Sequence, residues 1–182
     1  MKKTTFFVAF LFSLNALSQA PAIQWQKCLG GSNWDWAQSV QQTSDGGYIV
    51  AGYSASNDGD VSNNHGLGDC WLVKLDANGT MLWEKSIGGT NNDAAYSVQQ
   101  TNDGGYIVAG WTESNDIDVT GNHGGFDAWV VKVDSTGAIQ WQKCLGGTDY
   151  DVANSAVQTN DGGYIVAAGS RSSNGDLTSN HG

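Results

Sequence analysis

The sequence predicts an all-β protein made of tandem, four-stranded antiparallel units. The main observation is a repeat with a constant period of 58 residues, because Trp25, Trp83 and Trp141 each begin the pattern Trp-x-Lys-x-x-Gly-Gly. Each period also divides into four short segments rich in Val, Ile, Trp, Tyr and Thr, bounded by Gly, Asn or Asp. No apolar pattern has a helical period. Such repeats are typical of supersecondary units that stack and bury their apolar faces against one another.

The second unit shows the four expected strands most clearly, at residues 94–100, 105–111, 127–133 and 138–145. The first two are joined by the sequence Thr-Asn-Asp-Gly at 101–104. Asn, Asp and Gly accept the positive φ that tight hairpins require, so this segment is expected to be a turn. An equivalent turn joins the last two strands, and a long connection joins the middle two.

Four strands in a unit of about 40–60 residues are typical of a β-propeller blade; a β-solenoid, whose repeats are usually shorter, is the alternative. We therefore expect β-propeller-like repeats over residues 21–182. They divide into a lone fourth strand at 23–30, blades at 36–88 and 94–146, and a partial blade at 152–182. Propellers usually have about four to eight blades, so the prediction is an open or incomplete arc.

An open arc exposes unpaired strand edges, which invite aggregation. We therefore expect this chain to be the N-terminal part of a longer protein, or to close its arc through further blades or self-association.

Tryptophan supplies much of the expected core, because one buried indole removes roughly 150–250 Å² from water. Five tryptophans at repeated positions are predicted to pack between units: Trp25, Trp71, Trp83, Trp129 and Trp141. A row of sugar-stacking rings is the alternative for them. Three tryptophans break the repeat and are the better ligand-surface candidates: Trp34, Trp36 and Trp111.

The N-terminal residues have the layout of a secretory signal peptide. Lys2 and Lys3 precede an apolar run at 6–17, and small residues follow up to Ala20. A membrane anchor needs roughly 20 apolar residues, and polar residues interrupt this shorter run. We expect a signal peptide at 1–20, a secreted or cell-surface location, and no membrane insertion after the peptide is removed.

The net charge argues against one class of partner, and the cysteine positions argue against one disulfide bond. The net charge of −10 repels phosphate backbones, so nucleic acid is not an expected partner. The three cysteines are Cys28, Cys70 and Cys144. Cys28 and Cys144 occupy equivalent positions two periods apart, too far for the roughly 4.4–6.8 Å between Cα atoms that a disulfide needs. The cysteines are predicted to be small buried apolar side chains.

Several motifs recur in order and at constant spacing. They are Asp-Ala-Trp-Val-Val-Lys-Val-Asp at 127–134, Trp141 followed by Leu-Gly-Gly-Thr at 145–148, Asp151, and Asp-Gly-Gly-Tyr-Ile-Val-Ala at 161–167. Over residues 23–182 these motifs resemble the bacterial β-propeller repeat family, often called the seven-bladed β-propeller repeat. The resemblance implies a propeller fold and a secreted or cell-surface protein. It implies no reaction.

The pattern Thr-x-Asp-Gly-Gly at 43–47 recurs at 101–105 and 159–163, and it resembles the Asp-box turn of sialidases. That box is a structural hairpin, whereas sialidase sites hold the substrate carboxylate with several arginines, whose planar forks suit that group. Arg171 is the only arginine of this chain. Sialidase activity is therefore not expected.

Acidic pairs in the long loops are candidate calcium ligands, because hard oxygen ligands at alternate positions suit Ca²⁺. They are Asp58, Asp60, Asp116 and Asp118. The third copy has Asn174 at one of these positions, no Glu closes the loop as in an EF-hand, and loop formation is the alternative role. Calcium is thus the one candidate cofactor, and the sequence assigns no metal site.

Two further polar residues recur in every repeat, which favours structural roles over catalysis. The histidines are expected in turns or packing and not in zinc sites: His65, His123 and His181. The aspartates that follow each Gly-Gly are expected to cap that turn: Asp35, Asp93 and Asp151.

These observations predict a non-catalytic exported repeat protein that presents loop surfaces for adhesion or for protein or glycan binding. Every conspicuous polar residue occurs in several copies, whereas an enzyme usually needs one asymmetric site. Two alternatives stay open. In the first alternative the chain is the front part of a propeller-containing carbohydrate-active enzyme. In the second it is a calcium-stabilised surface module.

Overall fold

The computed structural model describes residues 20–180, which form ten strands and no helix. Two four-stranded sheets have the orders β1-β2-β3-β4 and β5-β6-β7-β8, and a two-stranded sheet pairs β9 with β10. All strand pairs are antiparallel. The strands are β1 Asp35–Gln42, β2 Tyr48–Ser54, β3 Asp69–Leu75, β4 Met81–Ile87, β5 Asp93–Gln100, β6 Tyr106–Thr112, β7 Asp127–Val133, β8 Ile139–Leu145, β9 Asp151–Gln158 and β10 Tyr164–Ser170. The all-β class and the four-stranded antiparallel units are confirmed.

Hairpin turns place the strands where the sequence predicts them. In the first turn the Thr43 amide donates to the Gly47 carbonyl at 2.9 Å, and Gly46 has a φ of 81°, a conformation that glycine adopts without steric cost. The same turn recurs at 101–105 and 159–163. In the second unit the third predicted strand, β7, has the predicted bounds. The starts of β5 and β8 differ by one residue, and β6 is shifted by one residue at both ends.

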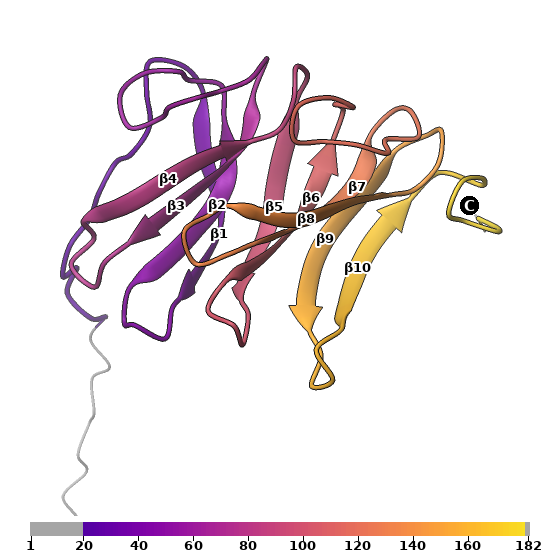
Figure 1. Ribbon diagram of the computed structural model, residues 1–182. Helices are drawn as coiled ribbons and strands as arrows, with labels where there is room; N and C mark the ends of the chain where they lie inside the picture. Colours follow the sequence, from indigo (N-terminus) through magenta and orange to yellow (C-terminus); the bar gives the residue numbers. More distant parts are fainter. Residues whose placement is uncertain (1–19, 181–182) are drawn as a thin grey trace, which may run out of the picture.

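The sheets lie side by side with their faces in contact (Figure 1). β5 contacts β1, β2 and β3 of the preceding sheet, and β9 contacts β5, β6 and β7. We call the side of a unit that carries Ile49, Ala51 and Leu72 in the first unit its rear face. The opposite side, which carries Val98 and Tyr106 in the second unit, is the front face. These residues form one buried cluster, so the rear face of one unit packs on the front face of the next.

The same contact recurs between the second and third units. Ile107 and Ala109 of the rear face cluster with Ala153 and Ala156 of the next front face. The core therefore lies between the sheets, and it is built twice from equivalent residues.

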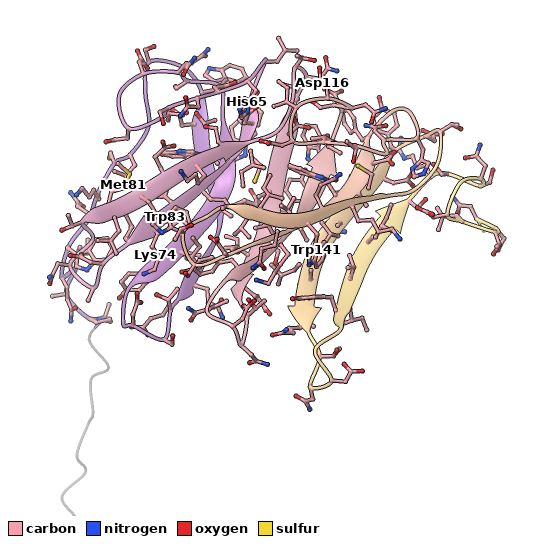
Figure 2. All side chains as sticks on the ribbon, in the orientation of Figure 1. His65, Lys74, Met81, Trp83, Asp116 and Trp141 are labelled. Atoms are coloured by element: carbon pink, nitrogen blue, oxygen red, sulfur yellow. The ribbon has the colours of Figure 1, made fainter. Side chains whose placement is uncertain are left out.

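The tryptophan prediction is confirmed in part. Trp71 and Trp129 on the third strands are buried. Trp25 and Trp141 are 41% and 38% exposed, so for them a core position is wrong. Trp83 is half-buried, because its ring lies against the turn at Gly137 of the next unit. The third unit has no third and fourth strands among the described residues to supply such a turn, so Trp141 is more exposed. Figure 2 shows Trp83 and Trp141 at equivalent places on their sheets.

The expected lone strand at 23–30 is also wrong, because the structure assigns no strand there. None of the described strands pairs with this segment. Its Trp25 nevertheless contacts Tyr48 with ring centroids 5.7 Å apart, as Trp83 contacts Tyr106 at 6.0 Å and Trp141 contacts Tyr164 at 5.3 Å. The segment thus holds the place of a fourth strand in irregular form.

The cysteines carry no disulfide in the described part of the chain. Cys70 and Cys144 are buried as predicted, whereas Cys28 is exposed, because it lies in the irregular segment. Residues 20–180 contain no helix long and apolar enough to span a membrane. The signal-peptide prediction falls almost entirely on residues 1–19, which lie outside the described residues.

Candidate functional site

The three tryptophans that break the repeat lie at one end of the sheets, together with several other residues that differ between units. This end, uppermost in Figure 1, holds the start of each first strand, the end of each second strand and the long loop that follows. Strand pairing brings Trp36 opposite Tyr53 and Ala94 opposite Trp111. We call the variable residues at this end the rim: Trp34, Trp36, Tyr53, Asn92, Trp111, Glu113, Phe126, Tyr150 and Arg171.

The rim between the second and third units is an aromatic cluster with one cation. The rings of Trp111 and Phe126 are stacked, with centroids 4.6 Å apart and planes at 18°. Phe126 meets Tyr150 edge to face at 4.7 Å, and the Arg171 guanidinium carbon lies 5.6 Å from the centre of the Tyr150 ring. Tyr150 is 48% exposed and Arg171 is exposed. This arrangement offers a flat apolar surface beside a positive charge.

The rim between the first and second units has different chemistry at the same positions. Tyr53 replaces Trp111, and its hydroxyl donates to Asn92 at 3.1 Å. The Asn92 amide in turn donates to Glu113 at 2.8 Å. Gly68 stands where the next unit has Phe126, because a Cβ at Gly68 would lie 2.2 Å from the Tyr53 ring. This boundary therefore presents a polar, acidic surface.

The first unit adds the most exposed ring of the rim. Trp34 is 76% exposed, and Trp36 is 42% exposed while its other side stacks on Tyr53 at 4.2 Å. The structure thus brings Trp36 onto Tyr53 and places Trp111 in the aromatic cluster. It leaves Trp34 without a ring partner among the described residues.

Sequence reasoning missed Phe126, Tyr150 and Arg171 as members of the rim. Each stands where the preceding unit has a residue of different chemistry, namely Gly68, Asn92 and Glu113. A position-by-position comparison of the repeats for every residue type, and not for tryptophan alone, could have found them.

The candidate calcium ligands accept hydrogen bonds from backbone amides near the Gly-Gly turns and do not surround a common point. Asp58 accepts from the Ser32 amide at 2.7 Å, and Asp116 accepts from the Thr90 amide at 2.9 Å and its hydroxyl at 2.8 Å. These bonds hold the pKa of both carboxyls below the usual value. Figure 2 shows Asp116 at the long-loop end.

Asp60 and Asp118 accept from the amides of the first glycine of each Gly-Gly pair, at 3.2 and 3.4 Å. In the third unit the uncharged Asn174 makes the bond equivalent to that of Asp58, with the Thr148 amide at 2.9 Å. This hydrogen bond to the turn therefore does not need a charged carboxylate. Within residues 20–180 no three His, Cys, Asp or Glu side chains are grouped to hold a metal ion.

The predicted capping of the Gly-Gly turn is confirmed. Asp93 accepts from the Gly89 amide at 2.7 Å, from the Ser114 hydroxyl at 2.8 Å and from the Thr112 hydroxyl. Burial raises the pKa of Asp93 against these bonds. Equivalent bonds surround Asp35 in the first unit and Asp151 in the third. We call this carboxylate with its two hydroxyl donors the clamp of each unit.

His65 and His123 lie in the long loops, each beside a buried carboxyl group. His65 Nδ1 is 2.8 Å from Asp69 Oδ2, and His123 Nδ1 is 2.6 Å from Asp127 Oδ2. Burial raises the pKa of Asp69 to about 6. Asp69 Oδ1 and Asp127 Oδ1 are buried and accept no hydrogen bond. His181 lies outside the described residues.

The Asp-box pattern also has a structural role, as predicted. Asp103 accepts from the Thr101 hydroxyl at 2.5 Å and the Gly105 amide at 3.0 Å, and it pairs with the Lys132 ammonium at 3.0 Å. The hydrogen bond from Thr101, followed by the one from Lys132, lowers the pKa of Asp103 to about 2. Lys132 is 2% exposed, so the turn fixes a buried cation.

Comparison with known proteins leaves the family open. No protein-family model matches the chain. Over 142 residues it is 28% identical to the regulatory protein FlaEY of Caulobacter vibrioides, an alignment that covers 69% of this chain and 14% of that protein. The chain therefore spans a small part of the length of this relative.

Proposed function

We propose that the chain is a non-catalytic, exported binding protein of the β-propeller repeat type, whose rim recognises a glycan or protein ligand. One observation carries the proposal. The hairpin turns and the clamps repeat from unit to unit, whereas the non-repeated tryptophans lie at one end of the sheets, together with Tyr150 and Arg171. In repeat proteins, the surface that stacking leaves free is the one available for binding.

The propeller arrangement is supported by the way the units stack. The first strands β1, β5 and β9 contact one another in sequence, while the fourth strands form the other edge of each four-stranded sheet. Sheets that converge along one edge and diverge along the other surround an axis as more units are added, as blades do.

The composition of the rim favours a ligand with flat faces and polar groups. Trp, Tyr and Arg dominate recognition surfaces because they combine a large contact area with a polar tip. Trp34 and Tyr150 offer exposed ring surface. Arg171 supplies a donor beside Tyr150, and Glu113 supplies an acceptor beside Asn92 at the other boundary. A saccharide, with apolar ring faces and hydroxyl groups, fits this combination best.

A glycan array probed with the purified chain tests the proposal. We expect selective binding that Trp34→Ala, Trp111→Ala and Arg171→Ala each weaken by at least tenfold, since each removes a buried contact or a charge-assisted bond in the complex. Leu82→Ala is the matched control, because Leu82 is 57% exposed on β4, away from the rim. Binding that all four variants retain would place the ligand elsewhere. Absence of glycan binding would contradict the saccharide assignment and leave a protein ligand.

A further inference from the structure

The third unit leaves its rear face open. Ile165 is 61% exposed and Ala167 is exposed, although they stand where the first and second units have fully buried residues. Those equivalents, which are at most 1% exposed, are Ile49, Ala51, Ile107 and Ala109. The Ile and Ala side chains of β10 therefore repeat a packing surface that has no partner within residues 20–180.

The first unit leaves its front face open in the complementary way. Val40 is 65% exposed, whereas its equivalent Val98 in the second unit is 2% exposed. A cavity of about 670 Å³ lies over this face, lined mainly by apolar side chains that include Val40, Tyr48, Val50, Val73 and Leu75. In the second unit the equivalent space is filled by the rear face of the first unit.

The two open faces are the two halves of a contact that the chain already makes twice. Rear face meets front face between units one and two, and again between units two and three. Trp25 already occupies the fourth-strand place over Tyr48, as Trp83 does over Tyr106. The cavity beside Trp25 is thus left for the first, second and third strands of a preceding unit. β9 and β10 are a first and a second strand.

Polar contacts between first strands set the register of this contact. The Gln100 side-chain oxygen accepts from the Ser44 amide at 2.8 Å, and that of Gln158 accepts from the Asn102 amide at 2.9 Å. The residue equivalent to the acceptor Gln100 on the open front face is Gln42. The residue equivalent to the donor Asn102 on the open rear face is Asn160. The same residues are therefore present on the two open faces.

A second polar contact is made at the first of the two boundaries. The Ser39 hydroxyl accepts from the Val98 amide at 3.3 Å. The equivalents on the open faces are Ser155 and the Val40 amide. When the open rear face is placed on the open front face as the units already stack, the apolar packing and both hydrogen bonds to backbone amides can form again.

From these matches we propose that two copies of this chain associate head to tail, with the rear face of β9 and β10 of one copy packed on the front face of β1 and β2 of the other. Ile165 and Ala167 then fill the cavity over Val40 and Val50, and the Asn160 amide donates to Gln42 of the neighbouring copy. The contact is heterologous, because different surfaces meet. Such contacts close into rings where the rotation per copy allows and otherwise continue as filaments.

Light scattering coupled to size-exclusion chromatography tests the proposal on the purified chain over a range of concentrations. We expect the mass to rise with concentration to at least twice that of the monomer. Val40→Asp and Ile165→Asp should each hold the mass at that of the monomer, because a carboxylate would be buried without a partner. Ile117→Asp is the matched control: Ile117 is 57% exposed in a long loop, and we expect wild-type association.

Mixing the two interface variants gives the decisive measurement. Val40→Asp keeps an intact rear face and Ile165→Asp keeps an intact front face, so a 1:1 mixture should form a dimer that cannot grow. A melting temperature close to wild type shows that each variant is folded. A wild-type chain that stays monomeric overturns the proposal. So does association that survives both substitutions, or a mixture of the folded variants that stays monomeric.

Discussion

The buried carboxyl of Asp69 makes stability depend on pH in an unusual direction. Asp69 is 0% exposed, and its pKa rises from 3.8 to about 6 mainly because burial disfavours the charged form. A raised pKa means that the folded state binds the proton more tightly than the unfolded state. The resulting stability is present below about pH 4 and is lost as the pH rises through about 6.

The magnitude follows from the size of the shift. A rise of about two pH units at 1.36 kcal/mol per unit corresponds to about 3 kcal/mol between acidic and neutral solution. Burial raises the pKa of Asp93 and Asp127 as well, which adds to the effect with the same sign. Asp45 and Asp103 have lowered pKa values, so their opposite contributions are lost only below about pH 4.

Urea unfolding at pH 4.5 and 7.5, followed by tryptophan fluorescence, measures this difference. We expect the wild type to have the larger free energy of unfolding at pH 4.5. Asp69→Asn should reduce the difference by about 2 kcal/mol, because the amide cannot ionise and still accepts from the His65 amide. Asp58→Asn is the control, since Asp58 is exposed, its pKa is lowered, and Asn174 already fills the equivalent position. Greater stability at pH 7.5, or an unchanged difference in Asp69→Asn, would refute the reasoning.

Further predictions concern the turns and the clamp. Gly105→Ala should lower the free energy of unfolding by about 1–3 kcal/mol, because its Cβ would lie 2.3 Å from the Val133 carbonyl oxygen, while Gly163→Ala, whose nearest neighbour would be 3.1 Å away, should cost less. Asp103→Ala should cost more than Lys132→Met, since the first leaves a buried ammonium without its carboxylate and the second leaves an exposed carboxylate in water. Thr112→Val should cost about 1–3 kcal/mol by removing a donor to the buried clamp. Urea unfolding checks all three, and an equal cost within either pair, or a Thr112→Val variant as stable as wild type, would contradict them.

Local signals explain why the strands and caps could be predicted. The turn at 101–105 fixes where β5 ends and β6 begins, because Gly104 requires a positive φ and Asp103 bonds the turn itself. The capping role of Asp93 depends on the glycine amide four residues earlier. Such interactions close within a few residues, so the sequence reveals them.

Long-range contacts explain what could not be predicted. Phe126 and Tyr150 are far apart in the sequence and meet only because neighbouring sheets align their ends. The exposure of Trp141 depends on whether another element covers the outer edge of its sheet. Residues 23–30 are irregular and pair with no described strand, although their sequence matches that of the fourth strands β4 and β8. Local pattern carries no information on such neighbours.

The clamp explains how the rim can vary without loss of the fold. Clamp and rim residues alternate along the chain: Thr112 and Ser114 turn inward to Asp93, whereas Trp111 and Glu113 take part in the rim. Successive strand residues point to opposite faces, so a substitution at the rim leaves the inward hydrogen bonds in place. The first and third units keep the same clamp beneath Tyr53 and beneath Arg171. A constant hydrogen-bonded network therefore supports a variable surface.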